Sequence, residues 1–328
     1  MTEYRADESA PSGQFPDNSE NRALAKRIGM SSLEQSLYFP KYFEVETINA
    51  CNAKCIMCTV REWPKRDQAV MPMELFAEFV SQIRDYSDWV ETVCLNRDGE
   101  PTLDKQLAVR VKMLKQAGIR FVTLSTNAQR LSVDLAQELF KAGLDDIMVS
   151  IDGYSKAVFE KIRIGLDFEK VVGNTLRAMK VRDRVRPSAK FRIRMVVLPE
   201  NRFEVEDWLH FWNTRVGKQD KVYAMPAHSW GNQTQQEMPE KVDKFADKPC
   251  VSVFSTMTMH ADGRVGFCGV DYEPKYAMGT FGPQTLKQIW NGEAYSLARQ
   301  KHATGRRNAF SLCRGCHLWD RQYQFAEE

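Results

Sequence analysis

Seven of the eight cysteines of this 328-residue chain fall into two spaced groups. Cys51, Cys55 and Cys58 form a C-x3-C-x2-C run, which we name the first cysteine group. The second cysteine group has the spacing C-x17-C-x44-C-x2-C and consists of Cys250, Cys268, Cys313 and Cys316. Cys94 stands apart from both groups. In a reducing compartment such spacing indicates metal binding or redox chemistry rather than structural disulfides.

Composition agrees with such a compartment and limits the partners. Forty-six basic residues against 43 acidic ones leave a net charge of +3, too close to balance for a nucleic-acid or polybasic membrane surface. The first residues, MTEYRADESAPSGQF, lack the basic and then apolar order of a signal peptide. No apolar run approaches the roughly 18 residues of a membrane-spanning helix. We therefore expect a cytoplasmic protein with no nucleic-acid partner and no membrane partner.

From residue 41 onward the hydrophobic pattern alternates between strands and amphipathic helices. Strands are predicted over residues 42–48, 90–95, 120–124, 146–151, 191–197 and 221–225. Helices of period 3.6 are predicted between them, over residues 72–86, 105–117, 132–142, 168–181 and 203–211. This alternation predicts an α/β fold in which about six units form a partial (β/α)6 barrel, short of the eight units of a closed barrel.

Two further segments are expected outside the barrel. Residues 1–40 are rich in Ser, Asp, Glu, Asn, Pro and Gly, which predicts a flexible N-terminal extension with at most a short helix. The barrel spans residues 41–235. Residues 236–328 are expected to form a small C-terminal α+β domain with a hairpin over 251–267 and a helix over 285–300.

The first cysteine group directly follows the first predicted strand. Ligands of parallel α/β sheets bind at this carboxyl edge. Three thiolates can hold three corners of a [4Fe–4S] cluster and leave one iron open for an external ligand. A three-cysteine zinc site completed by a distant residue, or thiols without metal, are the alternatives, although structural zinc sites usually come as paired C-x2-C knuckles.

Together with four further motifs, the run CNAKCIMC resembles the radical S-adenosylmethionine (SAM) superfamily. The motifs follow successive predicted strands and are Asp98-Gly99-Glu100-Pro101, Ser125-Thr126-Asn127, Ser150-Ile151-Asp152-Gly153 and Arg163-Ile164-Gly165. They are similar to the GGEP, STNG, SxDG and RxG positions of that family. Two residues depart from its pattern: Met57 replaces an aromatic residue, and Asp98 replaces the first glycine of GGEP.

The resemblance implies a set of cofactor-binding residues and a chemistry. The residues expected to contact SAM or to order its site are Met57, Gly99, Glu100, Ser125, Asn127, Ser150, Asp152, Arg163 and Arg194. Members of the family bind SAM on the open iron, cleave it with an electron from a flavodoxin- or ferredoxin-type donor, and release a 5′-deoxyadenosyl radical. The protein places the cofactor and excludes water, while the cofactor does the difficult chemistry.

The second cysteine group offers four thiolates and therefore a closed site. Zinc and a fully ligated [4Fe–4S] cluster both satisfy its spacing. The surrounding sequence, with DGRVGFC, GTFGPQTLKQIWNGEAYSLARQ and CRGC, resembles the SPASM/Twitch extension of radical SAM enzymes. Four cysteines fit the shorter Twitch form, which implies one auxiliary [4Fe–4S] cluster and two clusters in total. A cluster that only stabilises a small domain is the simpler alternative.

Within the Twitch form, the layout is similar to that of aminocyclitol dehydrogenases of antibiotic biosynthesis. This implies a small-molecule substrate, a sugar or aminocyclitol, whose secondary alcohol is oxidised while the auxiliary cluster accepts an electron. Epimerisation of such a substrate is the second candidate reaction. Peptide modification is the third, because no separate leader-peptide domain is evident in the N-terminal extension. A metal-stabilised binding module without turnover would require the motif matches to be accidental.

Two candidate catalytic residues separate these reactions. Cys94, near the end of the second predicted strand, is either a buried core cysteine or the hydrogen-atom donor that an epimerase needs. His228 follows the last barrel strand and is a candidate for substrate binding or proton removal. The remaining histidines, such as His302, lie in core-like or polar stretches and are expected to be structural or solvated. Arg192 and Arg194 share one face of a strand, where Arg194 can reach the SAM carboxylate or an anionic substrate, or both form surface ion pairs.

Overall fold

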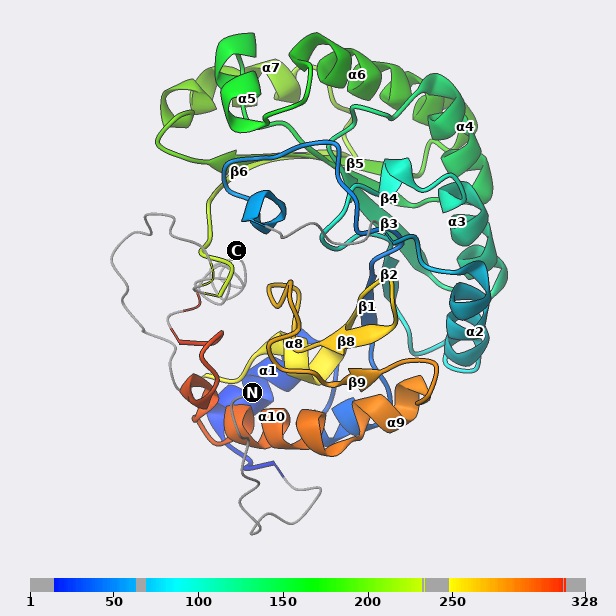
Figure 1. Cartoon of the computed structure of the whole chain (residues 1–328), viewed down its shortest axis with the longest axis vertical. Coiled ribbons are helices and arrows are strands. Elements are labelled where there is room, and N and C mark those ends of the chain that lie inside the picture. The colour runs from blue at the N-terminus through cyan, green and yellow to red at the C-terminus, as the bar shows by residue number, and fades with distance from the viewer. Residues whose placement is uncertain (1–14, 63–68, 232, 234–247, 315, 317–328) are drawn as a thin grey trace.

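The computed structural model describes residues 15–62, 69–231, 233, 248–314 and 316. Within these residues the strands form one nine-stranded sheet of order β6-β5-β4-β3-β2-β1-β7-β8-β9. Its first six strands pair in parallel and curve into an open barrel, whose outer face the helices cover (Figure 1). This confirms the predicted fold class, a partial (β/α)6 barrel followed by a small C-terminal α+β part.

The barrel elements follow the predicted order closely. Its strands are β1 Tyr42–Val45, β2 Thr92–Cys94, β3 Phe121–Thr126, β4 Asp146–Ser150, β5 Lys190–Val197 and β6 Lys221–Pro226. Its helices are α2 Met73–Arg84, α3 Leu107–Gln116, α4 Val133–Ala142, α5 Lys156–Ile162, α6 Phe168–Val185 and α7 Val205–Asn213. Short 3-10 turns cover Thr59–Glu62, Pro101–Leu103 and Arg202–Glu204. The helix α5 is an addition that the sequence pattern did not predict.

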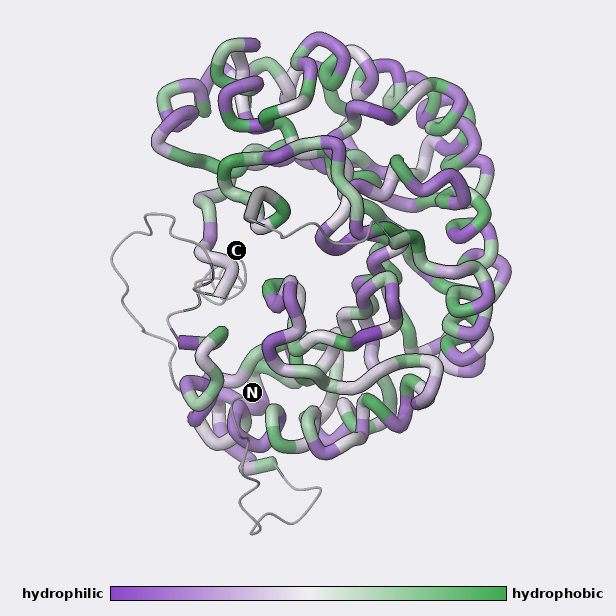
Figure 2. The backbone as a smooth tube through the Cα atoms, in the orientation of Figure 1, coloured by the Kyte–Doolittle hydropathy of each residue, from purple (hydrophilic) through white to green (hydrophobic). Residues whose placement is uncertain are grey.

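Local sequence explains where α4 begins and ends. The Ser132 hydroxyl accepts a hydrogen bond from the Leu135 backbone N–H, as an N-cap does. The helix ends at Gly143, whose φ of +101° lies in the left-handed region that glycine adopts without strain. In Figure 2 the outer helices alternate between hydrophilic and hydrophobic residues, as expected of helices that bury one face against a sheet.

The C-terminal part continues the barrel sheet rather than forming a separate one. Its elements are α8 Val251–Ser255, β7 Thr256–Met259, β8 Arg264–Gly266, β9 Gly279–Thr280, α9 Leu286–Trp290, α10 Glu293–Ala303 and a 3-10 turn over Arg307–Ala309. Strand β7 pairs in parallel with β1, and the antiparallel β8 and β9 follow. The described helices include none that is long and apolar enough to cross a membrane.

Two predictions for the C-terminal part are wrong in detail. The predicted hairpin begins later, because residues 251–255 form α8 and bury Val253 and Phe254 on its inner side. The predicted helix over 285–300 is two helices, since the chain breaks at Gly292, the N-cap of α10. Thr285 starts α9 with a capping box in which it and Gln288 exchange hydrogen bonds.

The described part of the N-terminal segment is folded, which corrects the flexible extension expected for residues 1–40. It contains α1 Ser19–Arg27 and a 3-10 turn over Leu33–Leu37. Leu24 is fully buried, and the Asn21 side chain donates a hydrogen bond of 3.1 Å to the Ala303 carbonyl. The Trp290 indole N–H donates to the Ser36 carbonyl at 2.6 Å. This segment therefore packs on the C-terminal part, whereas the predicted boundary near residue 235 lies outside the described residues.

Side chains on the barrel strands alternate between two environments. On β1 and β2, Phe43 and Val93 are buried against the helices, while Glu44 and Cys94 keep some accessible surface although they point into the barrel. Successive strand residues face opposite sides of a sheet. The inward residues thus share the inner side of the curved sheet, which we name the barrel lumen. Its further members, all with some accessible surface, are Met148, Arg192, Arg194 and Tyr223.

Candidate active site

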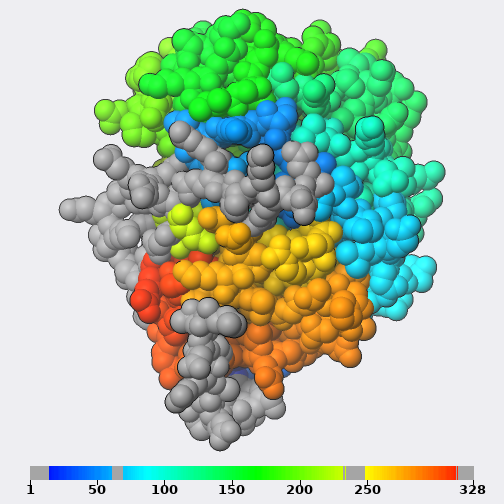
Figure 3. Space-filling model, in the orientation of Figure 1, coloured from blue at the N-terminus to red at the C-terminus, as the bar shows by residue number. Residues whose placement is uncertain are grey.

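The first cysteine group lies in the loop that leaves β1 and crosses the barrel mouth. The Lys54 backbone N–H donates to the Ile164 carbonyl at 2.8 Å, and that of Ile56 donates to the Ile162 carbonyl at 3.0 Å. These bonds fasten the loop to the end of α5. Figure 3 shows the blue surface of this region beside the green barrel helices. The first cysteine group thus lies on a loop that packs against the end of α5.

Arg163 and Asp152 act on the first cysteine group rather than lining the lumen. An Arg163 guanidinium nitrogen lies 3.6 Å from the Cys55 sulfur, and its Nε donates to Asp152 Oδ2 at 2.6 Å. The other carboxylate oxygen of Asp152 accepts from the Val196 backbone N–H at 2.7 Å. Because Asp152 has no exposed surface and both its oxygens are engaged, it positions Arg163, which supplies positive charge beside a thiolate.

The thiols of the first cysteine group need a strong positive charge to ionise. Burial raises the pKa of Cys51 and of Cys58 to about 12, and it also raises the pKa of Cys55, against the nearby charge of Arg163. Bound iron provides the required charge, because a coordinating thiol is deprotonated outright. The chemistry of this donor set therefore fits a metal cluster.

Glu100 occupies the centre of a dense hydrogen-bond network beside the cysteine loop. Its Oε1 accepts from the Thr102 N–H at 3.0 Å and from the Thr102 and Thr126 hydroxyls, both at 2.6 Å. Its Oε2 accepts from the Asn127 N–H at 2.7 Å. Burial raises the pKa of this carboxyl, while the four donors lower it. The network holds the side chain in one orientation, ready to contact a ligand through its remaining lone pair.

Gly99 allows the loop after β2 to pass close to the cysteine loop. A Cβ at this position would lie 2.0 Å from the Ile48 carbonyl oxygen and 2.9 Å from that of Ala50. The next residue, Glu100, donates its N–H to the same Ala50 carbonyl at 2.8 Å. Only glycine therefore fits here, and the GGEP-like loop is fastened directly to the chain that carries Cys51.

The remaining residues predicted to contact SAM gather at the carboxyl ends of β3, β4 and β5. The Asn127 side chain donates to Asn52 Oδ1 at 2.9 Å, and the Ser125 N–H donates to the Asn96 side chain at 2.8 Å. The Ser150 hydroxyl accepts from Arg194 at 2.9 Å. The fold thus brings these predicted residues to one edge of the sheet, and their contact with SAM stays a prediction.

Trp230 is a residue of this site that the sequence interpretation missed. Its indole N–H donates to the Met57 carbonyl at 2.8 Å, and its backbone N–H donates to His228 Nδ1 at 3.1 Å. The centroids of the Trp230 and His228 rings lie 4.8 Å apart. Trp230 thus places an aromatic ring beside Met57, where the family has an aromatic residue in the chain itself. Its position two residues after His228, which was already a candidate, could have indicated this residue in the sequence.

Cys94 points into the lumen. Its thiol donates to Asn96 Oδ1 at 3.0 Å, and burial raises its pKa to about 11. It is therefore a protonated thiol that carries a hydrogen atom. On β5, Arg192 pairs with Asp146 through an Nε–Oδ1 contact of 2.7 Å, and this ion pair is partly open to solvent, because 34% of the Arg192 side chain is exposed.

The second cysteine group collects around a buried histidine. Cys250 precedes α8, Cys268 follows β8, and Cys313 and Cys316 follow the last 3-10 turn. His302 Nδ1 accepts from the Cys250 N–H at 3.0 Å, and its Nε2 lies 3.7 Å from the Cys313 sulfur.

His302 is therefore part of this site. It was expected to be either structural or solvated, and the second of these expectations is wrong. Its side chain has no exposed surface, and burial together with the charge of Arg307 lowers its pKa to about 3. The ring is neutral, and since Nδ1 accepts, the proton is on Nε2. The sequence could not indicate this contact, because α10 carries His302 far from Cys250 along the chain.

Arg97 connects the two sites. It forms an ion pair with Asp98 in the GGEP-like loop and donates hydrogen bonds to the backbone carbonyls of Cys268, at 3.3 Å, and of Asp271. Its side chain is almost completely buried. The loop that is expected to bind SAM is thereby tied to the loop that carries a cysteine of the second group.

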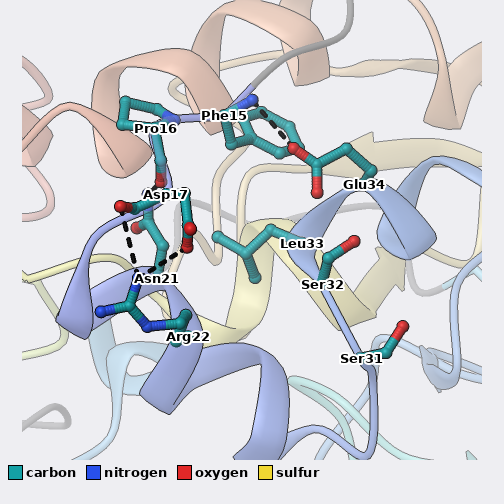
Figure 4. Close-up of a pocket in the computed structure, with 9 residues that line it drawn as sticks. All are labelled: Phe15, Pro16, Asp17, Asn21, Arg22, Ser31, Ser32, Leu33 and Glu34. Atoms are coloured by element: carbon teal, nitrogen blue, oxygen red, sulfur yellow. Dashed lines mark hydrogen bonds and ion pairs between the residues drawn. The ribbon is translucent and has the colours of Figure 1, made fainter.

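A pocket elsewhere on the molecule does not belong to this site. It has a volume of about 350 Å³ and is lined by residues of the N-terminal segment alone, from Phe15 to Glu34. Figure 4 shows the Arg22–Asp17 ion pair and the bond from the Phe15 N–H to Glu34 at its walls. No cysteine lines it.

An open six-stranded barrel with three thiolates at its mouth, followed by a second thiolate site, defines a metal-cluster enzyme of the radical SAM class. Family models agree with this definition. The model of the radical SAM superfamily matches residues 45–211, half of the chain, and that of the SPASM iron–sulfur cluster-binding domain matches residues 250–317. The chain belongs to the radical SAM superfamily and is a radical SAM/SPASM enzyme, which implies SAM and [4Fe–4S] clusters as cofactors.

Curated relatives include probable GTP 3′,8-cyclases. That of Saccharolobus islandicus (strain Y.N.15.51 / Yellowstone #2) is 34% identical over 134 residues, which are 40% of this chain and 42% of the relative. That of Sulfurisphaera tokodaii is 28% identical over 251 residues, 75% of this chain and 72% of the relative. The match to the first of these relatives thus spans less than half of its length.

Solved structures with a similar fold hold different bound molecules. BtrN in complex with AdoMet and 2-DOIA has a TM-score of 0.59 and 19% identity, covering 85% of this chain and 93% of BtrN. Streptococcus suis SuiB bound to precursor peptide SuiA has a TM-score of 0.64 and 14% identity, covering 84% and 69%. Native anSMEcpe with bound AdoMet has a TM-score of 0.63 and 15% identity, covering 86% and 94%. At such identities the likeness concerns the fold alone.

Proposed function

We propose that this protein is a radical SAM dehydrogenase that oxidises a secondary alcohol of a sugar or aminocyclitol to a ketone. The observation that carries the proposal is the contact between the lumen and the second cysteine group. Glu44 points into the barrel, and its Oε2 lies 2.7 Å from the position of a Cβ built on Gly269, the residue after Cys268. An electron acceptor held by this group adjoins the space in which a substrate radical forms.

The residues divide the work between two cofactor sites. Cys51, Cys55 and Cys58 hold the first cluster, and Cys250, Cys268, Cys313 and Cys316 hold the second, each proposed to be [4Fe–4S]. When bound, SAM and the first cluster supply the 5′-deoxyadenosyl radical and the second cluster supplies an acceptor for one electron. Glu100, Asn127, Ser150 and Arg194 orient SAM at the barrel mouth, and Arg97 keeps the two sites at a constant separation.

The proposed oxidation balances in atoms and electrons. Removal of a hydrogen atom from the carbinol carbon leaves a carbon-centred radical that still bears the hydroxyl group. This radical loses the hydroxyl proton and one electron, and the carbon–oxygen bond becomes the double bond of the ketone. His228, fixed through Nδ1 by the Trp230 N–H, is proposed to bind the substrate or to take the proton. A cluster held by the second cysteine group would accept the electron.

The electron that starts the cycle has to come from outside the chain. A flavodoxin- or ferredoxin-type protein is the proposed donor, and the proposed cytoplasmic location would give the enzyme access to it.

The resemblance to the 2-deoxy-scyllo-inosamine dehydrogenase of butirosin biosynthesis supports this choice, as does the BtrN-like fold over 85% of the chain. Epimerisation of such a substrate is the second candidate. It is favoured by Cys94, whose protonated thiol points into the lumen and can return a hydrogen atom to a substrate radical.

Reaction of the anaerobically reconstituted enzyme with SAM, a reductant and 2-deoxy-scyllo-inosamine tests the proposal. We expect two cubane clusters per chain by iron and sulfide analysis, 5′-deoxyadenosine, and a ketone that has lost two hydrogens by mass spectrometry. One cluster plus zinc would exclude the electron-acceptor step. Formation of an isomer with one solvent-derived hydrogen, abolished by Cys94→Ala with SAM cleavage retained, would establish epimerisation instead.

A further inference from the structure

Glu44 is a partly exposed carboxylate to which the proposed mechanism gives no chemical role. It lies on β1, opposite Cys94 of β2 and Thr258 of β7 in the sheet register. Its side chain points into the lumen and keeps some accessible surface there. A molecule that enters the barrel beside β1 would therefore meet this carboxylate.

Within the described residues, the Glu44 carboxylate forms no hydrogen bond and no ion pair. Burial raises its pKa, and only the charge of Arg97 opposes that effect. Arg97 does not serve as its partner, because its guanidinium nitrogens bond to Asp98 and to the carbonyls of Cys268 and Asp271. Glu44 thus depends on a donor that the surrounding protein does not provide.

Of the other inward cations, Arg192 is paired, because its Nε donates to both oxygens of Asp146, at 2.7 and 3.0 Å. Arg194 donates to the Ser150 hydroxyl at 2.9 Å, at the edge where SAM is expected, while its Nε has no hydrogen-bond partner among the described residues. Burying a charge without a partner is costly, so a cation brought by a ligand would stabilise the charged form of Glu44.

The shape of the site restricts what that ligand brings. Gly269 is the wall opposite Glu44, and any side chain there would collide with the carboxylate. The free space around the oxygens thus lies toward the lumen. An ammonium group offers a positive charge and three donors, and a charge-assisted hydrogen bond to a carboxylate is about twice as strong as a neutral one. A triphosphate would bring negative charge to the same place.

We propose that Glu44 binds the amino group of an amine-bearing substrate inside the barrel, and so selects aminocyclitols or amino sugars over neutral cyclitols and nucleotides. This inference rests on the proposed function and adds the substrate class and the residue that recognises it. It also separates the chain from the relatives named as probable GTP 3′,8-cyclases. The amine would then lie beside Gly269, with the rest of the ring toward Cys94.

Equilibrium binding to the reconstituted, SAM-loaded enzyme tests the inference without turnover. Isothermal titration calorimetry compares 2-deoxy-scyllo-inosamine, scyllo-inositol and GTP as probes. We expect the wild type to bind the amine at least tenfold more tightly than the other two. Glu44→Gln, which keeps the shape and removes the charge, should lose that preference, while Glu44→Asp should keep part of it. Glu138→Gln, on the exposed face of α4, is the matched control.

The outcomes distinguish this inference from the proposed function. Equal binding of the amine by the wild type and Glu44→Gln would overturn the role of Glu44, even if the ketone forms. Amine binding that depends on Glu44 without ketone formation would keep the inference and reject the dehydrogenase. Preference for GTP, or no binding of the amine by the wild type, would overturn the inference. A thermal unfolding curve and the iron content of Glu44→Gln exclude misfolding as the cause of lost binding.

Discussion

Replacing His302 by asparagine should lower the reduction potential of the second cluster without removing the cluster. The side-chain oxygen of asparagine takes the place of Nδ1 and still accepts from the Cys250 N–H, which His302 accepts at 3.0 Å. The donor at Nε2, 3.7 Å from the Cys313 sulfur, is lost. Glutamine is the matched variant, because its amide nitrogen takes the place of Nε2 and keeps this donor.

The expected size of the shift follows from the hydrogen bond. A donor to sulfur stabilises the reduced cluster more than the oxidised one, since the reduced cluster carries more negative charge. Hydrogen bonds to charged groups contribute at least about 1.5 kcal/mol. Because the 3.7 Å contact is long, we assign it about half of that value. For a one-electron couple, about 59 mV corresponds to a tenfold change, and the shift is therefore about 30 mV downward.

Potentiometric titration followed by electron paramagnetic resonance measures this shift. We expect His302→Asn to fall by about 30 mV and His302→Gln to remain close to the wild type, with the same iron content in all three proteins. An unchanged potential in His302→Asn, or equal shifts in both variants, would refute the assignment of the Nε2 proton to the sulfur. Loss of iron in both variants would show that His302 is needed for assembly rather than for the potential.

Three further predictions concern the barrel. Glu100→Gln replaces a carboxylate oxygen, which accepts from backbone N–H groups, by an amide nitrogen, which donates. This change should weaken SAM binding about tenfold by calorimetry, whereas exposed Glu138→Gln should not change it. Gly99→Ala, whose methyl group would lie 2.0 Å from a carbonyl oxygen, should lose the SAM site and iron from the first cluster; wild-type iron content and affinity would contradict this. Asp220→Ala breaks a buried ion pair with Arg182 of 2.7 Å and should reduce the free energy of unfolding by about 3 kcal/mol in urea. A loss below about 1 kcal/mol would mean that water solvates the remaining charge.

Periodicity was sufficient to predict the six barrel strands and every barrel helix except α5, because these elements depend on neighbours in the sequence. The helix α4 begins at a capping serine and ends at a left-handed glycine, and both residues are visible in the chain. Segments whose structure depends on distant partners were predicted less well. Residues 251–255 alternate like a strand but form α8, whose Val253 and Phe254 are buried. Likewise the polar N-terminal segment folds because Leu24 and its neighbours find a surface on the C-terminal part.

The cysteine spacing, together with the four motifs that accompany it, determined the class of this protein, because thiolates three and four residues apart in one loop reach the same cluster whatever surrounds them. Tertiary structure alone decided what lies between the two cysteine groups. Strand β7 joins β1, so Glu44 meets Gly269 and Arg97 meets Cys268. The members of each pair lie far apart in the chain, and no local pattern marks them. The sequence therefore indicated radical chemistry, whereas only the fold shows which residues of the two parts lie side by side.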